Sequence, residues 1–425
     1  MGATRASIQG FSSRSTGIGA TVCGISIVDG RRTAFGKLSG ALCSVTPTDL
    51  GISASRAALE ASRVPASEVS QAIVANIGHG SGDSLFLARH IALYSGAALE
   101  TPALLVQRLC GSGIEVLAKA AEQIAAGQGN VVLGCGTESM SRFPLVSFGI
   151  RQGFSLGKPE VIDFLWEALN DTSAVPMGHT ADNLARQYKL TRLEVDEFAL
   201  QSQSRYRAAY EQGVFKEEMF AFPKSGVFEG QGLKPRKFRA NCQQDLIADE
   251  HPRQTTMEKL ATLPFAFTKE GPTTAGNASG IVDGAAASVI ASDEYVTAHG
   301  LKPIGKILGY CSIGVEPQIM GIGPAPAIRS VLKALKMNVS DIDLFEINEA
   351  FGAQCLAVAR ELELDLGKLN VNGGAVAIGH PLAATGMRLA ISCLKTLRRQ
   401  KKQFGVVSAC IGGGQGIAMV LEVAA

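Results

Sequence analysis

The stretch LLVQRLCGSGIEVLAKAAEQI, residues 104–124, sets a lone cysteine against a Gly-Ser-Gly turn between two regular patterns. The apolar run 102–109 predicts a buried strand of the kind found inside parallel sheets. Apolar residues then recur at helical spacing, and Gly127 ends the pattern, which predicts a helix. Cys110 therefore lies at a strand-to-helix turn, where backbone N–H groups and a helix dipole favour a nucleophilic thiolate. An inert buried cysteine is the alternative.

The composition excludes several classes of protein. A chain of 425 residues with 46% hydrophobic residues, 18% charged residues and 48 glycines is typical of a compact globular protein. A net charge of +2 gives no argument for binding nucleic acid or an anionic membrane. No apolar run reaches the roughly 18 residues of a membrane span. Nine cysteines without a C-x-x-C pair, and six histidines without an H-E-x-x-H pair, argue against disulfides and metal sites and favour a reducing compartment.

The first 28 residues contain two arginines, several serines and threonines, and no acidic residue. This composition resembles an organelle transit peptide, so we expect residues 1–22 to be a removable mitochondrial leader, with the first strand starting near Gly24. The alternative is an ordinary tail of a cytoplasmic protein.

Strand and helix patterns alternate along the chain, which favours an α/β fold with a mostly parallel sheet. We expect a first half over 23–297 and a second half over 298–425. Residues 141–276 hold the single tryptophan and much of the charge, and predict a loop domain inserted in the first half. The runs VVLGCGTESM (131–140) and VVSACIGGGQG (406–416) are alike, which indicates an internal duplication, and 404–422 predicts two strands around a glycine turn.

Four polar spots follow apolar runs and are flanked by glycine: Cys110, Asn348 with Glu349, His380, and Cys410 before Gly412–Gly414. Loops at the ends of strands are where α/β sheets place their sites. An imidazole beside a helix N-terminus favours its neutral form, which accepts a proton from a thiol. Glycine N–H groups suit an oxyanion hole. Acyl transfer needs a nucleophile, a base and oxyanion donors together. The alternative is that each residue has only a structural role: His380 caps a helix, Cys410 is buried in a hairpin, and Asn348 forms a turn.

Seven motifs carry a specific resemblance: RLCGSG, GCGTESMS, TTAGNASGIVDGAAA, IMGIGPAPAI, EINEAF, NVNGGAVAIGHPLAATG and ACIGGGQG. Together they resemble the thiolase family over about Gly24 to Glu422. The segments LARHIAL, ETPALLVQRLCGSG and DEHPRQTT are most similar to its mitochondrial 3-ketoacyl-CoA branch.

The resemblance implies the thiolase fold, in which two similar αβ halves form a five-layered αβαβα arrangement with an inserted loop domain. It implies CoA-dependent cleavage of 3-ketoacyl-CoA to acetyl-CoA and a shortened acyl-CoA, as in fatty-acid β-oxidation, or the reverse Claisen condensation. It further implies a homodimer or homotetramer with coenzyme A as substrate and with no metal or permanently bound cofactor. The alternatives are a biosynthetic acetoacetyl-CoA thiolase and a catalytically idle lipid-carrier or structural subunit.

Residue roles follow from the same resemblance. Cys110 resembles the acylated nucleophile, His380 the group that activates it, and Cys410 the acid/base cysteine. Asn348 resembles the residue that holds an oxyanion-hole water, and the N–H groups of Cys110 and Gly412 resemble a second oxyanion hole.

The resemblance also assigns binding residues. Ser279 resembles a contact to the pantetheine arm of CoA, and Arg253 and Thr255 resemble contacts to its nucleotide end. Met320 belongs to the substrate-binding set. So does His179, which stands where an apolar residue is more usual and is expected to alter the acyl pocket.

Overall fold

The computed structural model describes residues 4–230 and 232–424. Its strands are β1 (Ser7–Ser13), β2 (Gly17–Cys23), β3 (Ile25–Arg32), β4 (Gly36–Lys37), β5 (Gln71–Ala75), β6 (Ala103–Val106), β7 (Val131–Ser139), β8 (Leu145–Val146), β9 (Ile162–Asp163), β10 (Ser225–Phe228), β11 (Arg236–Arg239), β12 (Val282–Ser292), β13 (Gly305–Gly314), β14 (Leu344–Ile347), β15 (Phe404–Ile411) and β16 (Gln415–Val423).

The helices are α1 (Pro47–Ser62), α2 (Leu87–Tyr94), α3 (Ser112–Ala125), α4 (Phe164–Leu169), α5 (Met177–Gln187), α6 (Arg192–Glu211), α7 (Met257–Ala261), α8 (Asp293–Ala298), α9 (Pro324–Leu335), α10 (Gly352–Glu361), α11 (Ala375–Ile378) and α12 (Leu382–Gln400). Local signals set several of their ends. Thr191 and Glu194 form a reciprocal capping box at the start of α6. No helix in the described ranges is long and apolar enough to cross a membrane.

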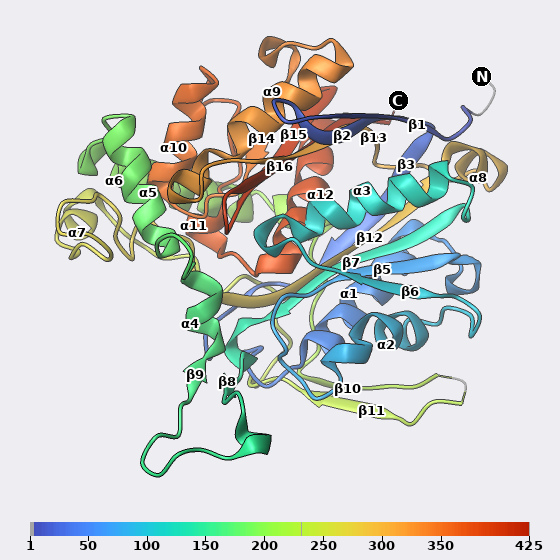
Figure 1. Ribbon diagram of the computed structural model, residues 1–425. Coiled ribbons are helices and arrows are strands. Elements are labelled where there is room, and N and C mark those ends of the chain that lie inside the picture. The colour runs from blue at the N-terminus through green and yellow to red at the C-terminus, as the bar shows by residue number, and fades with distance from the viewer. Residues whose placement is uncertain (1–3, 231, 425) are drawn as a thin grey trace.

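One large sheet runs through the molecule in the order β14-β15-β16-β13-β3-β12-β7-β5-β6 (Figure 1). Helices α1 and α2 pack on one face of the first-half strands, and α3 packs on β5 and β7. Helix α12 contacts α3, the first-half strands β7 and β12, and the second-half strands β14 and β15. Helix α9 packs on β13 and β16, with α10 beside it. The result is five alternating helix and strand layers, with α3 and α12 in the middle.

The expectation of a mostly parallel sheet is wrong. In the large sheet, the described strands pair in parallel in β5–β6, β5–β7 and β14–β15, whereas the other pairs, including β12–β3, β12–β7 and β13–β16, are antiparallel. The hairpin β15–β16 was predicted and is confirmed. The sequence does not show the direction of strands such as β12, which is buried along its whole length. A strand buried on both faces has the same apolar pattern whether it pairs in parallel or antiparallel.

The expectation that the first strand starts near Gly24 is also wrong. Strands β1 and β2 form a hairpin, and residues 18–21 of β2 pair with residues 309–312 of β13. A Cβ atom on Gly19 would lie 2.2 Å from the carbonyl oxygen of Tyr310, so this pairing depends on glycine. The small polar residues of such a hairpin are the same residue types that make up a transit peptide, so composition does not separate the two. Residues 1–3 of the expected leader lie outside the described residues.

The strand predicted before Cys110 exists as β6, but it is an edge strand and is not buried. It pairs with β5 on one side. The side chains of Leu104 and Leu105 are 37% and 41% exposed. Exposed leucines on a free edge are typical of a surface that another chain covers.

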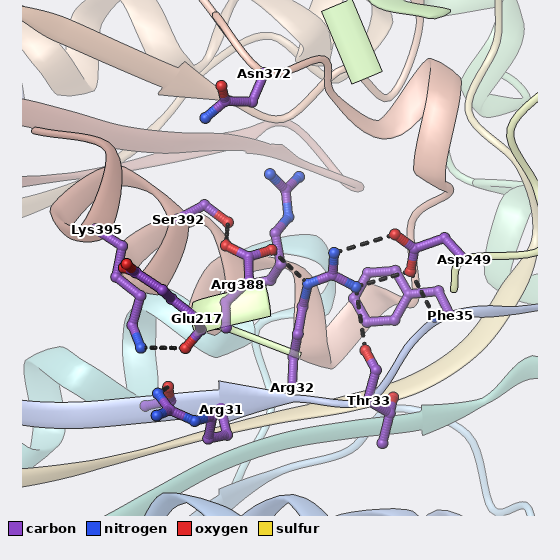
Figure 2. Close-up of polar contacts among 12 residues, drawn as sticks. Arg31, Arg32, Thr33, Phe35, Glu217, Asp249, Asn372, Arg388, Ser392 and Lys395 are labelled. Carbon is purple, nitrogen blue, oxygen red and sulfur yellow. Dashed lines mark hydrogen bonds and ion pairs between the residues drawn. The ribbon is translucent and has the colours of Figure 1, made fainter. Parts of the chain in front are cut away.

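A buried polar network joins β3 to the segment 217–249 and to α12 (Figure 2). Arg32 is fully buried, and its guanidinium group donates to Asp249 Oδ1 at 2.7 Å and to Glu218 Oε1 at 2.7 Å. Burial acts to lower the pKa of Arg32, but the two carboxylates raise it further, so the group stays charged. Ser392 of α12 donates to the other oxygen of Glu218, and Lys395 donates to the backbone oxygen of Glu217. Strand β3, the segment 217–249 and helix α12 are therefore connected by one buried network of ion pairs and hydrogen bonds.

Replacing Arg32 by alanine should cost about 3–5 kcal/mol of unfolding free energy, because it leaves Asp249 and Glu218 buried without their cation. Urea unfolding followed by circular dichroism measures the loss. Arg31→Ala is the matched control, since Arg31 pairs with Asp29 while 24% exposed and should cost no more than about 1 kcal/mol. Equal losses in the two variants would contradict the prediction.

Candidate active site

Cys110 lies in a tight turn between β6 and α3, as the sequence predicts. The turn is one stretch of 3-10 helix, Leu109–Gly111. Leu109 has a φ of +43°, an uncommon conformation for a leucine that the surrounding bonds must hold in place. Ser112 supplies them, because its hydroxyl group donates to Leu109 O at 2.7 Å and accepts from Arg108 N at 2.7 Å.

The first turns of α3 and α12 touch through their backbones. A Cβ atom on Gly113 would lie 2.5 Å from Met387 N, and one on Gly386 would lie 2.4 Å from Ile114 N. Cys110 immediately precedes α3, and His380 immediately precedes the start of α12. Two glycines thus bring together a cysteine and a histidine that are 270 residues apart in the sequence.

His380 is buried, and its hydrogen bonds decide which ring nitrogen is free. The Thr385 hydroxyl group lies 2.6 Å from Nδ1 and 3.2 Å from Pro381 O. Asn348 Nδ2, an amide donor, lies 3.3 Å from Nε2, which therefore accepts. With Nε2 as the acceptor, Nδ1 carries the proton of the ring and donates it to the Thr385 hydroxyl group, whose own proton goes to Pro381 O. Burial, and then the charge of Arg388, lower the pKa of His380 to about 3, so the ring is neutral and Nε2 is an acceptor.

Both cysteines rest as thiols. Burial raises the pKa of Cys110 to about 11, while N–H groups of Gly412 and of Cys110 itself act in the opposite direction. The thiolate that the helix dipole was expected to favour is therefore not the resting form, because the dipole is weaker than the cost of burying a charge. Burial also raises the pKa of Cys410, and the neighbouring Cys110 raises it further.

A small cavity of about 60 Å³ is lined by five of the ten predicted site residues. The predicted residues on its wall are Cys110, His380, Gly412, Ser279 and Met320. Asn348 is not on the wall, but its amide contacts His380, which is. Cys410 is also not on the wall, and it packs against the wall residues Met320 and Ala350. The wall is otherwise apolar: Leu109, Ala168, Leu169, Met177, Ala350, Phe351 and Leu382.

The other three predicted residues, His179, Arg253 and Thr255, also lie outside the wall of this cavity. His179 of α5 packs edge-on against Phe267, whose ring in turn packs against Phe351 of the wall. Arg253 donates to Ala275 O at 3.1 Å, in the segment that leads to Ser279. Thr255 is half-buried two residues further on.

Comparisons with known proteins agree with this geometry. Residues 25–294 match the family model "Thiolase, N-terminal domain", and residues 301–423 match "Thiolase, C-terminal domain". The bovine "3-ketoacyl-CoA thiolase, mitochondrial" is 46% identical over 94% of this chain and 98% of its own. The Escherichia coli "Acetyl-CoA acetyltransferase" is 41% identical over 93% and 98%. The chain belongs to the thiolase family.

Solved thiolase structures carry the same fold. The crystal structure of human mitochondrial 3-ketoacyl-CoA thiolase in complex with CoA has a TM-score of 0.87 and 44% identity, covering 95% of this chain and 98% of that one. The Bacillus anthracis acetyl-CoA acetyltransferase has a TM-score of 0.86 and 39% identity, covering 97% and 100%. The α/β thiolase fold expected from the sequence is confirmed, and the protein is a thiolase-family acyltransferase.

Sequence reasoning missed three features of this thiolase site. Thr385 sets the tautomer of His380, Ser112 holds the Cys110 turn, and α4 closes the cavity with Ala168 and Leu169. The signal for Thr385 was available, since it lies one helical turn after His380, but Ala168 and Leu169 come from the inserted segment. Within the described ranges, no three His, Cys, Asp or Glu side chains gather as metal ligands.

The resting thiol predicts a pH dependence of Cys110 alkylation. Below a raised pKa the thiolate fraction increases about tenfold per pH unit, so the iodoacetamide rate should rise steadily between about pH 6 and about pH 9. Mass spectrometry of the Cys110 peptide gives the rate, and the exposed Cys23 reports reagent activity in the same samples. A plateau from neutral pH upward would reveal a resting thiolate–imidazolium pair and overturn the assignment.

Proposed function

We propose that the protein cleaves 3-ketoacyl-CoA with a second CoA, giving acetyl-CoA and an acyl-CoA shortened by two carbons. One observation carries the proposal: the Cys110 thiol, the imidazole of His380 with Nε2 as its acceptor, and Gly412 line one largely apolar cavity. These are the nucleophile, the proton acceptor and the oxyanion donor that acyl transfer needs. The names of the 3-ketoacyl-CoA thiolase relatives support the same reaction.

The first half-reaction makes an acyl-enzyme. His380 Nε2 takes the proton of Cys110, and the sulfur attacks the 3-keto carbon. The C2–C3 bond then breaks, and its electron pair leaves as the enolate of acetyl-CoA. Preset donors must meet the enolate oxygen, and one good donor is worth about 3–4 kcal/mol. Asn348 is proposed to hold a water for this purpose, and the contact of its amide with His380 Nε2, at 3.3 Å, supports a role beside the imidazole.

The second half-reaction uses Cys410. Its thiol protonates carbon 2 of the enolate and releases acetyl-CoA. The resulting thiolate takes the proton of the incoming CoA thiol, which attacks the acyl-enzyme. Cys110 leaves as a thiolate and recovers its proton from His380, so both cysteines return to their resting form. In the reverse direction Cys410 removes a proton from acetyl-CoA, and a Claisen condensation follows.

Coenzyme A is proposed as substrate, with no permanently bound cofactor and no metal. Ser279 is proposed to contact the pantetheine arm, which its position on the cavity wall supports. Arg253 and Thr255, further out along the adjoining segment, are proposed for the nucleotide end. His179, behind Phe267 and Phe351, would affect the acyl pocket through those rings.

Biosynthetic acetoacetyl-CoA synthesis is the second candidate, because acetyl-CoA acetyltransferases are also relatives at 39–41% identity. A ladder of 3-ketoacyl-CoA substrates separates the two. Activity that falls to background beyond four carbons would favour the biosynthetic enzyme. An idle subunit would cleave none of them, although it would have little reason to keep Cys110, His380 and Cys410 together.

We further propose a homodimer or homotetramer. The free edge of β6 exposes Leu104 and Leu105. The β8–β9 segment stands away from the body of the molecule (Figure 1) and has exposed apolar side chains: Leu145, Phe148, Ile150, Leu156, Val161 and Trp166. Sedimentation at micromolar concentration tests this, and a monomer would contradict it.

A mitochondrial location is proposed from the mitochondrial relatives and the acid-free first 28 residues, with a cytoplasmic location as the alternative. Sequencing the N-terminus of the native protein from fractionated cells tests the leader. Removal of residues 1–22 would give a mitochondrial chain starting near residue 23 and would strip β2 from β13. The pairing of β2 with β13 argues for retention, and a cytosolic chain starting at Met1 or Gly2 would exclude the leader.

Replacing Cys110 and replacing Cys410 should impair different steps of the reaction. Cys110→Ser should lose at least about 10³-fold in thiolysis and form no acyl-enzyme with acetyl-CoA, because the nucleophile is gone. Cys410→Ser should lose carbon–carbon cleavage to a similar degree but still become acylated. Thiolysis assays and mass spectrometry measure both, and Cys23→Ser, an exposed cysteine, is the control. An adduct that persists in Cys110→Ser and vanishes in Cys410→Ser would reverse the roles.

A further inference from the structure

Glu138, at the end of β7, has a fully buried carboxyl group that accepts four N–H donors. Asn76 Nδ2 and Gly78 N donate to Oε1 at 2.9 and 3.0 Å, and Ile77 N donates to Oε2 at 3.2 Å. The fourth donor is Ala383 N, 3.3 Å from Oε2. No Arg, Lys or His of the described chain acts as its counter-ion, so these hydrogen bonds are what compensate its burial.

The bond to Ala383 joins Glu138 to the start of α12. Ala383 is the second residue of the helix, and no side chain caps the helix at Pro381. Glu138 therefore satisfies an otherwise unpaired N–H group from a strand of the other half of the molecule, at the positive end of the helix dipole. Gly136 of the same strand permits the contact, since a Cβ atom there would lie 2.1 Å from Ala383 O. His380 lies three residues before Ala383.

The other three donors belong to the turn after β5, which supports the cavity wall. A Cβ atom on Gly78 would lie 1.9 Å from the ring of Phe143, so this ring rests directly on the turn. The rings of Phe143 and Phe164 are 6.2 Å apart. Phe164 begins α4, whose Ala168 and Leu169 line the cavity beside Cys110.

We propose that Glu138 is a positioning residue for acyl transfer, which holds His380 and the α4 wall of the cavity in register with Cys110. This inference rests on the proposed function. One carboxyl group connects the start of α12 to the support of α4, so its loss lets both move relative to the α3 turn. A displacement of about 1 Å of a reacting group is enough to cost about 100-fold in rate.

Glu138→Gln is the direct test, because glutamine keeps the shape and replaces one acceptor oxygen by an N–H₂ donor. Whichever way the amide turns, two of the four N–H groups then face a donor. We expect kcat for thiolysis to fall about 10- to 100-fold, with KM for CoA changed less than about threefold, because the contacts proposed for the nucleotide end of CoA, at Arg253 and Thr255, lie outside the cavity.

Alkylation of Cys110 by iodoacetamide supplies a readout that simple destabilisation would not produce. Burial raises the pKa of Glu138 to about 8, so its carboxyl group is charged in the alkaline part of the assay range, where that charge adds to the effect of burial in raising the pKa of Cys110. The glutamine variant should therefore be alkylated at least as fast as the wild-type enzyme while its kcat falls. A loss of both kcat and alkylation would mean a collapsed site and would overturn the proposal.

Asp293→Asn is the matched control. Asp293 is also a buried carboxylate, which accepts from Ser26 Oγ at 2.7 Å and Lys306 Nζ at 2.6 Å, but it belongs to α8, outside the cavity wall. Its variant should lower the melting temperature and leave kcat within about twofold of the wild-type value when assayed well below the melt. If Asp293→Asn and Glu138→Gln lose kcat equally, the role of Glu138 is general stability.

Asn76→Ala keeps the test decisive if Glu138→Gln does not fold. It removes one donor of Glu138 and spares Ala383, so kcat should fall less than in Glu138→Gln, in the same direction and with KM unchanged. A wild-type kcat in Asn76→Ala would overturn the proposal. Failure of the proposed function looks different, since the wild-type enzyme itself would then cleave no 3-ketoacyl-CoA.

Discussion

The active site depends on the backbone contact between the first turns of α3 and α12. Gly113 and Gly386 lie at this crossing, and neither position has room for a methyl group. The helices start two residues after Cys110 and His380, so the crossing brings these two residues together. A side chain at either glycine would separate the helices, because packed interiors leave no space to absorb it. The pairing of the proposed nucleophile and base is thus a property of helix packing.

Burial then decides the chemistry of the groups brought together. It raises the pKa of Cys110 to about 11 and lowers that of His380 to about 3, so the resting site is uncharged. In the proposed mechanism, a proton moves from thiol to imidazole when donors such as Gly412 N meet the charge that develops on the substrate. In a small cavity with a mostly apolar wall, electrostatic interactions are much stronger than in bulk water, which supports the proposal of an enolate leaving group.

Two buried ionisable groups of the first half, Arg32 and Glu138, have several polar partners each. Arg32 has Asp249 and Glu218, and the network extends to Ser392 of α12, eleven residues into the helix that His380 precedes. Glu138 has four N–H donors at the start of the same helix. Helix α12 is therefore held at both its first turn and its middle by polar groups of the first half.

The sequence alone predicted several local elements of the fold and several residues of the candidate site. The strand-turn-helix around Cys110, the β15–β16 hairpin and the helix after His380 follow from local periodicity and glycine placement, which act over a few residues. Motif resemblance added the fold and the roles of Cys410, Asn348 and Ser279. The cavity confirms that Cys110, His380 and Gly412 lie together, but a linear pattern carries no distance between residues 110 and 380.

Only the tertiary structure decided the remainder. Buried strands such as β12 look the same in either direction, so the antiparallel pairing had to come from the fold. The N-terminal hairpin and a transit peptide share one composition, and pairing with β13 is what distinguishes the hairpin. The exposed leucines of β6, the neutral state of Cys110 and the four donors of Glu138 all depend on which atoms surround a residue. Burial and long-range hydrogen bonds arise from contacts between segments far apart in the chain, and local sequence does not encode them.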